Sequence, residues 1–132
     1  MNFSRRKRKE SFVAPEGIYH AYFRQALRIR NQPGGPSFIR LVFELDIDDP
    51  QTLYLAQKQY VEKLEPGSPL ARDLQLWLGT EAAKIWAKVD FGTLKGKDAL
   101  VDIAHMHTAA EHSPSCFIRS IKPAPEFYHC DF

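Results

Sequence analysis

The sequence is poor in cysteine, with Cys116 and Cys130 as the only two among 132 residues. Two cysteines cannot form the disulfide framework of a small secreted domain, and such low usage is typical of a reducing compartment. No apolar run approaches the roughly 18 residues that a membrane-spanning helix needs. Residues Ser11 to Gly17 do not form the apolar core of a signal peptide. We therefore expect a cytoplasmic protein that does not engage a membrane.

Motifs of common enzymes are also missing. The sequence contains no Walker loop, no Gly-x-Ser-x-Gly, no His-Glu-x-x-His and no dinucleotide-binding fingerprint. The carboxylates of Asp46, Asp48 and Asp49 could hold the metal of a nuclease. However, Asp-Asp-Pro is also a common turn composition, so we predict a turn there and no catalytic residue.

Histidine is clustered near the C-terminus without a zinc motif. His105 and His107 would share one face of a strand, and His112 and Cys116 follow closely. Zinc takes such ligands, usually four of them. Neither Cys-x-x-Cys nor the zinc-finger spacing is present. We therefore expect no metal and no other cofactor.

Charge is unevenly distributed along the chain. The formal charge is +2, but without the uninterrupted cations Arg5 to Lys9 it would be −3. An apolar content of 44% is sufficient for one compact core. We predict a disordered basic arm over residues 1–14, one domain over 15–125 and a short tail over 126–132.

Two strands and a hairpin are predicted after the arm. Ile18 to Arg30 is rich in aromatic and β-branched residues, and Phe38 to Asp48 alternates between apolar and polar residues. The sequence NQPGGPS between them is a strong turn signal. Residues 51–60 suit a third strand, although Ala56 to Leu64 could equally be helical, and we favour the strand.

A helix and two further strands complete the prediction. Ser68 and Pro69 form a helix start, and Gly79 a stop, with Leu70, Leu74, Trp77 and Leu78 at helical spacing between them. A short second helix is predicted after Gly79. Strands are predicted over 99–107 and 115–122. The protein is therefore mostly β, and this element order predicts a five-stranded Greek-key barrel of the OB-fold type, with the helix between strands three and four.

Several segments resemble small OB-fold single-stranded-DNA-binding proteins of phages and mobile genetic elements. The matching residues are Gly17 and Tyr19, Ser68 to Gly79, Leu94 to Lys97, Val101 to His105, and Ile118 to Pro123. The resemblance covers roughly residues 16–123, and the chain departs from it in the basic arm and the His-rich fourth strand. It implies a protein encoded beside replication or recombination genes that binds single-stranded DNA and hands it to a recombinase or polymerase.

Period-two alternation supplies candidate binding residues. In the first strand it places Ala21, Phe23, Leu27 and Ile29 on one face and the arginines on the other. If the hairpin forms, the arginine face gathers cations that neutralise phosphates and aromatic rings that stack on bases. Lys95 and Lys97 would form a rim loop, and Arg5 to Lys9 an arm with further phosphate contacts. The candidate residues are Tyr22, Arg24, Arg28, Arg30, Phe38, Arg40, Lys95, Lys97, Arg5, Arg6, Lys7, Arg8 and Lys9.

Other interpretations remain open at this point. The arginines could line the solvated face of any sheet, with Tyr22 and Phe38 covering each other. The arm could be a solubility tail. The chain could instead be a small protein-interaction module that binds or inhibits a host protein. The sequence also leaves open DNA against RNA, a homodimer, and partner recruitment by the C-terminal Asp-Phe.

Overall fold

A computed structural model describes residues 8–30, 32–63, 65, 67–79, 91–106 and 115–125. The described elements are β1 (Lys9–Ser11), β2 (Gly17–Arg30), β3 (Ser37–Leu45), β4 (Thr52–Val61), α1 (Pro69–Leu78), the 3-10 helix η3 (Phe91–Leu94), β5 (Asp98–Met106) and β6 (Ser115–Lys122). The mostly-β class, the hairpin, the helix and the two late strands are thus confirmed. Residues 52–61 form a strand rather than a helix.

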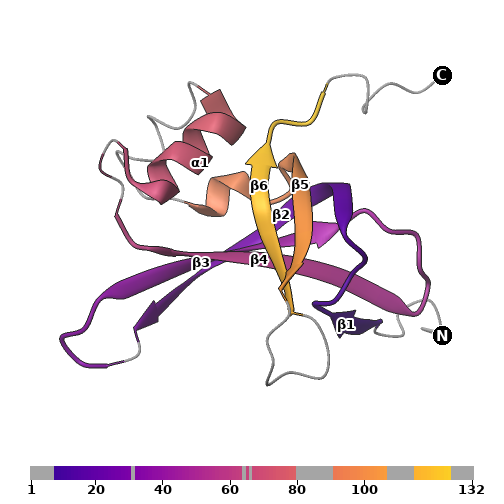
Figure 1. Cartoon of the computed structure of the whole chain (residues 1–132), viewed down its shortest axis with the longest axis horizontal. Helices are drawn as coiled ribbons and strands as arrows, with labels where there is room; N and C mark the ends of the chain where they lie inside the picture. The colour runs from indigo at the N-terminus through magenta and orange to yellow at the C-terminus, as the bar shows by residue number, and fades with distance from the viewer. Residues whose placement is uncertain are drawn as a thin grey trace.

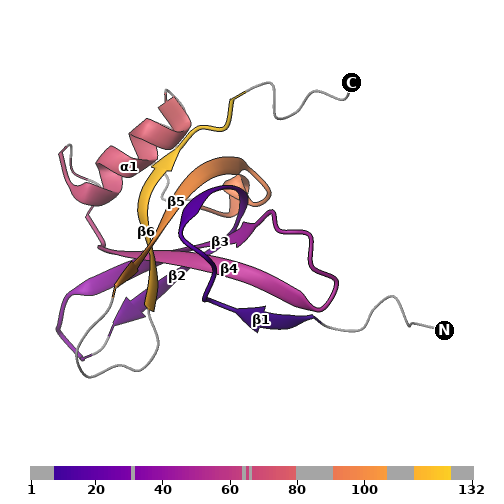
Figure 2. The same cartoon turned by 45° about the vertical axis from the view of Figure 1, so that its right-hand side comes forward.

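The strands form one coiled sheet in the order β1-β4-β3-β2-β5-β6 (Figures 1 and 2). All neighbours are antiparallel except β1 and β4. Five strands were predicted, and the sixth is β1. The predicted barrel is not closed, because no strand pairing joins β6 to β4 among the described residues. The sheet is instead open and wraps around its core.

The core lies on the concave side of this sheet and beneath α1. Ile39, Leu41, Phe43 and Leu45 of β3 are all buried, as their alternation predicts. Trp77 of α1 reaches the same core and packs on Phe23 and Phe43, with ring centroids 5.8 and 5.3 Å away. Its indole Nε1 donates a hydrogen bond to the carbonyl of Asp98 at 2.7 Å. Trp77 therefore anchors the helix to both halves of the sheet.

The helix has the boundaries that its sequence predicts. Ser68 is extended, and its hydroxyl accepts a hydrogen bond from the backbone N–H of Ala71. Pro69 needs no such partner because it has no N–H. At the other end Gly79 has φ of +63°, which is favourable for glycine. No helix among the described residues is long and apolar enough to cross a membrane.

The N-terminal segment is part of the fold from Arg8 onward. β1 pairs with the first residues of β4, and Ala14 is 3% exposed. The carbonyl of Ala14 accepts hydrogen bonds from His105 Nε2 at 2.6 Å and from the Cys116 thiol at 3.3 Å. Glu16 also accepts the backbone N–H of His105. The expectation of a disordered segment up to residue 14 is therefore wrong for residues 8–14.

Some predictions concern residues outside the described part of the chain. These are the arm cations Arg5, Arg6 and Lys7, the short second helix after Gly79, and the tail over residues 126–132. His107 and His112, two of the zinc candidates, also lie outside it.

Candidate nucleic-acid interface

The site is built on the outer face of β2, β3 and β4, which is the side of these strands turned away from the core. Its composition follows from the strand register, because residues directly opposite each other in antiparallel strands point to the same side. The face consists of Tyr22, Arg24, Gln25, Leu27 and Ile29 of β2, Phe38, Arg40, Val42 and Glu44 of β3, and Leu55, Gln57, Gln59 and Val61 of β4. We call this set the outer face.

An apolar row crosses the outer face near the hairpin turn. Ile29 of β2 lies opposite Phe38, and Phe38 lies opposite Val61. Val61 is 49% exposed, and Leu27 beside this row is 39% exposed. Tyr22 stands at the other end of the face, opposite Glu44. Tyr22 and Phe38 therefore do not cover each other, and the alternative interpretation in which they do is wrong.

The next row carries an arginine held by an amide. Arg40 lies opposite Leu27 and Gln59, and its Nη2 donates to Gln59 Oε1 at 2.8 Å. Gln25 and Gln57 follow on either side of Val42. The middle of the face thus presents hydrogen-bonding groups with a fixed cation beside the apolar row.

Arg24 reaches this face because of a β-bulge. The register of β2 on β3 slips between Phe23 and Gln25, so Arg24 is the extra residue. Its Nη1 lies 3.5 Å from Glu44 Oε1 on the outer face. Beside it, Phe23 N–H donates to the Lys97 carbonyl and Gly96 N–H donates to the Phe23 carbonyl. The backbone of the predicted rim loop, Lys95 to Lys97, is therefore hydrogen-bonded to Phe23, the residue that precedes Arg24.

The same bulge places Arg28 and Arg30 on the other side of the sheet. After it, Ala26 faces the core side, and so do Arg28, opposite buried Ile39, and Arg30, opposite Ser37. Arg28 forms an ion pair with Glu62 at 2.6 Å. Arg30 donates to the Ser37 hydroxyl at 2.8 Å. The prediction that all the candidate strand residues share one face is therefore wrong for these two arginines, and Leu27 and Ile29 take their place.

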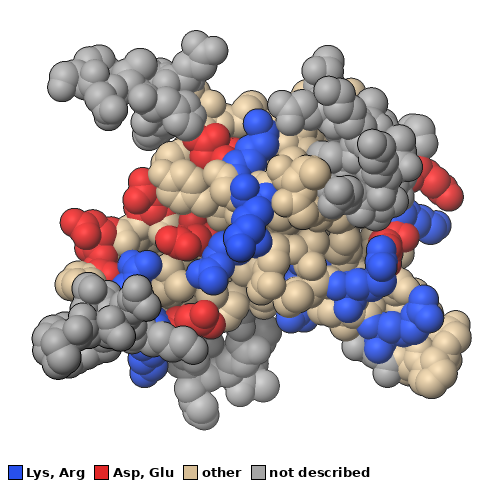
Figure 3. Space-filling view, turned by 180° about the vertical axis from the view of Figure 1, so that it is seen from behind, with Lys and Arg blue, Asp and Glu red and all other residues tan. Residues whose placement is uncertain are grey.

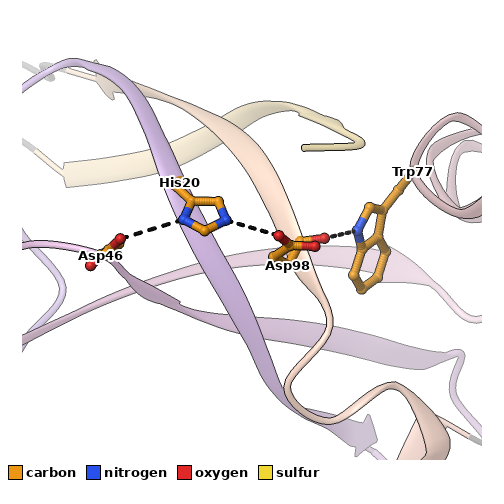
Figure 4. A network of polar contacts seen from close by, with 4 residues as sticks. All are labelled: His20, Asp46, Trp77 and Asp98. Atoms are coloured by element: carbon orange, nitrogen blue, oxygen red, sulfur yellow. Dashed lines mark hydrogen bonds and ion pairs between the residues drawn. The ribbon is translucent and has the colours of Figure 1, made fainter. Parts of the chain in front are cut away.

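Carboxylates surround the Tyr22 end of the face. His20 stands between two of them, with Nε2 3.0 Å from Asp98 and Nδ1 3.4 Å from Asp46 (Figure 4). The Tyr22 ring lies edge-on to His20 at 4.9 Å. Partial burial raises the pKa of Tyr22, and the charges of Asp46, Asp98 and Glu44 raise this pKa further. We call this end of the outer face, where Tyr22 lies opposite Glu44, its acidic end.

The described part of the basic arm joins the face at its acidic end. Arg8 Nη2 lies 4.0 Å from Glu44 Oε2, and Lys9 of β1 pairs with Thr52 of β4. Seen from behind the view of Figure 1, Lys and Arg side chains form a band down the middle of the molecule (Figure 3). Carboxylates flank this band on one side, and a second group of cations lies on the other.

The acidic turn does not assemble into a metal site. Asp49 Oδ1 accepts the backbone N–H groups of Gln51 and Thr52, as expected of a turn residue. Asp46 faces His20 instead. Among the described residues, no group of three or more histidine, cysteine or acidic side chains is placed to hold a metal ion.

Sequence reasoning missed the bulge, and with it the true members of the face. A signal was present: Arg24 and Gln25 are adjacent polar residues between apolar Phe23 and Ala26, which interrupts period two. It also left out Gln57, Gln59 and Val61, whose position depends on the pairing of β4 with β3.

Comparison with models of known protein families gives no match, and comparison with curated protein sequences gives none either. The resemblance to single-stranded-DNA-binding proteins therefore rests on the motifs alone.

Proposed function

We propose that the protein binds single-stranded DNA through the outer face, with little sequence preference. The proposal rests on two adjacent rows of side chains on the outer face. One is the apolar row of Ile29, Phe38 and Val61, and the other is the row of Leu27, Arg40 and Gln59. Aromatic rings beside cations are what single-strand-binding proteins use, because every base offers a face for stacking and every nucleotide a phosphate. The aromatic ring here is that of Phe38, which is half-buried.

Each part of the face has a role in this proposal. Phe38 stacks on a base, with Ile29 and Val61 as apolar flanks. Arg40, oriented by Gln59, contacts a phosphate or stacks its guanidinium on the next base. Arg24 and the loop from Lys95 to Lys97 continue the phosphate track. Because these contacts involve no set of donors and acceptors fixed against one base edge, binding tolerates many sequences.

The topology supports an OB-type assignment, which we also propose. The long strands lie in the order β4-β3-β2-β5-β6, with α1 between β4 and β5. The OB-fold is a partly open Greek-key barrel of five strands, and the face of its second and third strands binds oligonucleotides. The corresponding strands here are β3 and β4, which carry Phe38, Arg40, Gln59 and Val61.

The biological setting follows from the resemblance and is part of the proposal. In a phage or mobile element, such a protein protects single strands and hands them to a recombinase or polymerase. A homodimer would double the length of strand that is covered.

Fluorescence anisotropy with a labelled oligo-dT of about 30 nucleotides tests the proposal. We expect binding at about 50 mM salt that weakens by orders of magnitude at about 200 mM. Phe38→Ala is expected to weaken it about 5- to 150-fold, the loss of one stacked base. Phe12→Ala, an exposed phenylalanine outside the outer face, is the matched control and should bind as the native chain does. An oligo-rU of the same length separates DNA from RNA preference.

A second candidate function, a protein-interaction module, is favoured by one observation. Ile18 of β2 is 69% exposed and Phe117 of β6 is 36% exposed, at the end of the sheet far from the hairpin turn. They lie on strands that flank β5, and large exposed apolar side chains at one end of a sheet can mark a protein interface. Failure of the native chain to bind oligo-dT at low salt would favour this function over the first.

A further inference from the structure

Two arginines from distant parts of the chain meet at one carboxylate. Glu44 Oε2 lies 4.0 Å from Arg8 Nη2, and Glu44 Oε1 lies 3.5 Å from Arg24 Nη1. Each carboxylate oxygen thus faces a different guanidinium. The three side chains belong to β3, to the N-terminal segment and to β2, so the arrangement depends on the whole sheet.

Two irregularities of the sheet create this meeting point. The bulge in β2 inserts Arg24 as an extra residue, and bulges commonly re-aim a side chain in this way. The parallel pairing of β1 with β4 holds the N-terminal segment at the sheet edge. Arg8 is further tied there by a contact of its Nη1 with the Asp49 carbonyl, at 3.5 Å.

The site is open to a ligand. The side chains of Arg8, Arg24 and Glu44 are 39%, 40% and 34% exposed. Exposed ion pairs of this kind are weak, so a stronger anion can replace the carboxylate at small cost. A phosphodiester shares one negative charge between two non-bridging oxygens, as a carboxylate does between its two oxygens, and the arginine fork can bind either group through two parallel hydrogen bonds.

We propose that Arg8 and Arg24 form a phosphate site for the DNA backbone, and that Glu44 occupies this site in the free protein. The inference rests on the proposed function and deepens it, because it names which phosphate contact is made and what it must displace. It also gives the basic arm a defined place: Arg5, Arg6 and Lys7 directly precede the arginine that enters the site. Glu44 thereby lowers the affinity for DNA.

The test compares Glu44→Gln with Glu62→Gln. Both substitutions remove one negative charge, but Glu44→Gln frees Arg8 and Arg24 on the outer face, whereas Glu62→Gln frees Arg28 on the opposite side of the sheet. In oligo-dT anisotropy, Glu44→Gln is expected to bind about fivefold tighter than the native chain, the effect of removing weak exposed pairs. Its slope of log affinity against log salt should steepen by about 0.7 for one additional phosphate contact. Glu62→Gln should show only the small gain from net charge.

Adding Arg8→Gln and Arg24→Gln to Glu44→Gln should abolish the gain. Equal behaviour of Glu44→Gln and Glu62→Gln would overturn the inference while leaving the proposed function in place. A native chain that binds no oligo-dT at low salt would overturn the proposed function itself, so the two failures are distinguishable. Circular dichroism melting of each variant separates a folding defect from a binding effect.

Discussion

At the scale of single residues, Tyr60 joins β4 to α1. It is 4% exposed, and its hydroxyl donates to Asp73, which also pairs with Lys58 at 2.7 Å. Tyr60→Phe keeps the ring but removes a hydrogen bond to a charged acceptor. We expect the free energy of unfolding to fall by about 1.5–3 kcal/mol, measured by urea titration. Tyr54→Phe on the same strand is the control and should change little, because Tyr54 makes no side-chain hydrogen bond with the described residues.

The same hydroxyl predicts a pH dependence. Burial, and then the hydrogen bond to Asp73, raise the pKa of Tyr60 well above its ordinary value of 10.0. A raised pKa means that the unfolded chain loses its proton first as the pH rises. The stability from Tyr60 is therefore complete below pH 10 and is lost at higher pH, by at most about 1.4 kcal/mol per pH unit. Unfolding titrations between about pH 9 and 11 should show that the free energy of unfolding falls less steeply with pH in Tyr60→Phe than in the native chain. An equal loss in both proteins would contradict this origin.

At the scale of elements, the N-terminus of α1 depends on Ser68. Its hydroxyl accepts the Ala71 N–H and donates to the Lys63 carbonyl at 2.7 Å. Ser68→Ala should lower the free energy of unfolding by about 1 kcal/mol, the usual value of an N-cap. Thermal unfolding by circular dichroism measures this. Ser120→Ala on β6 serves as the control, since its hydroxyl bonds to none of the described residues, and an equal loss there would show that the cap contributes nothing.

The elements also show what the sequence could predict and what it could not. Strand and helix limits came from local signals: the turn after Arg30, the Ser68-Pro69 start and the Gly79 stop. The faces of β3 followed from simple alternation. The faces of β2 failed at one residue, because the bulge at Arg24 reverses every later side chain. A one-residue slip in register costs little locally, yet it moved Arg28 and Arg30 out of the candidate site.

At the scale of the whole molecule, the errors arose from contacts between residues far apart in sequence. β1 pairs with β4 over a separation of more than 40 residues. A strand of three residues is too short for its sequence pattern to predict that pairing. Barrel closure likewise depends on how β6 and β4 meet, which the order of strands leaves open. The opposite charges of Glu44 and Arg8 became neighbours only through this tertiary arrangement.

The anchoring of Arg8 gives a prediction for the basic arm. A chain that starts at Arg8 keeps β1 and loses only Arg5, Arg6 and Lys7 among the cations, so its melting temperature should not change. If the arm contacts DNA, the slope of log affinity against log salt should become shallower by up to about 2, since each of three lost phosphate contacts contributes about 0.7. Neutral replacement of the same three residues by glutamine, in a chain of full length, should reproduce the effect. An unchanged slope in both proteins would show that the arm is a solvated tail, and that the phosphate track begins at Arg8.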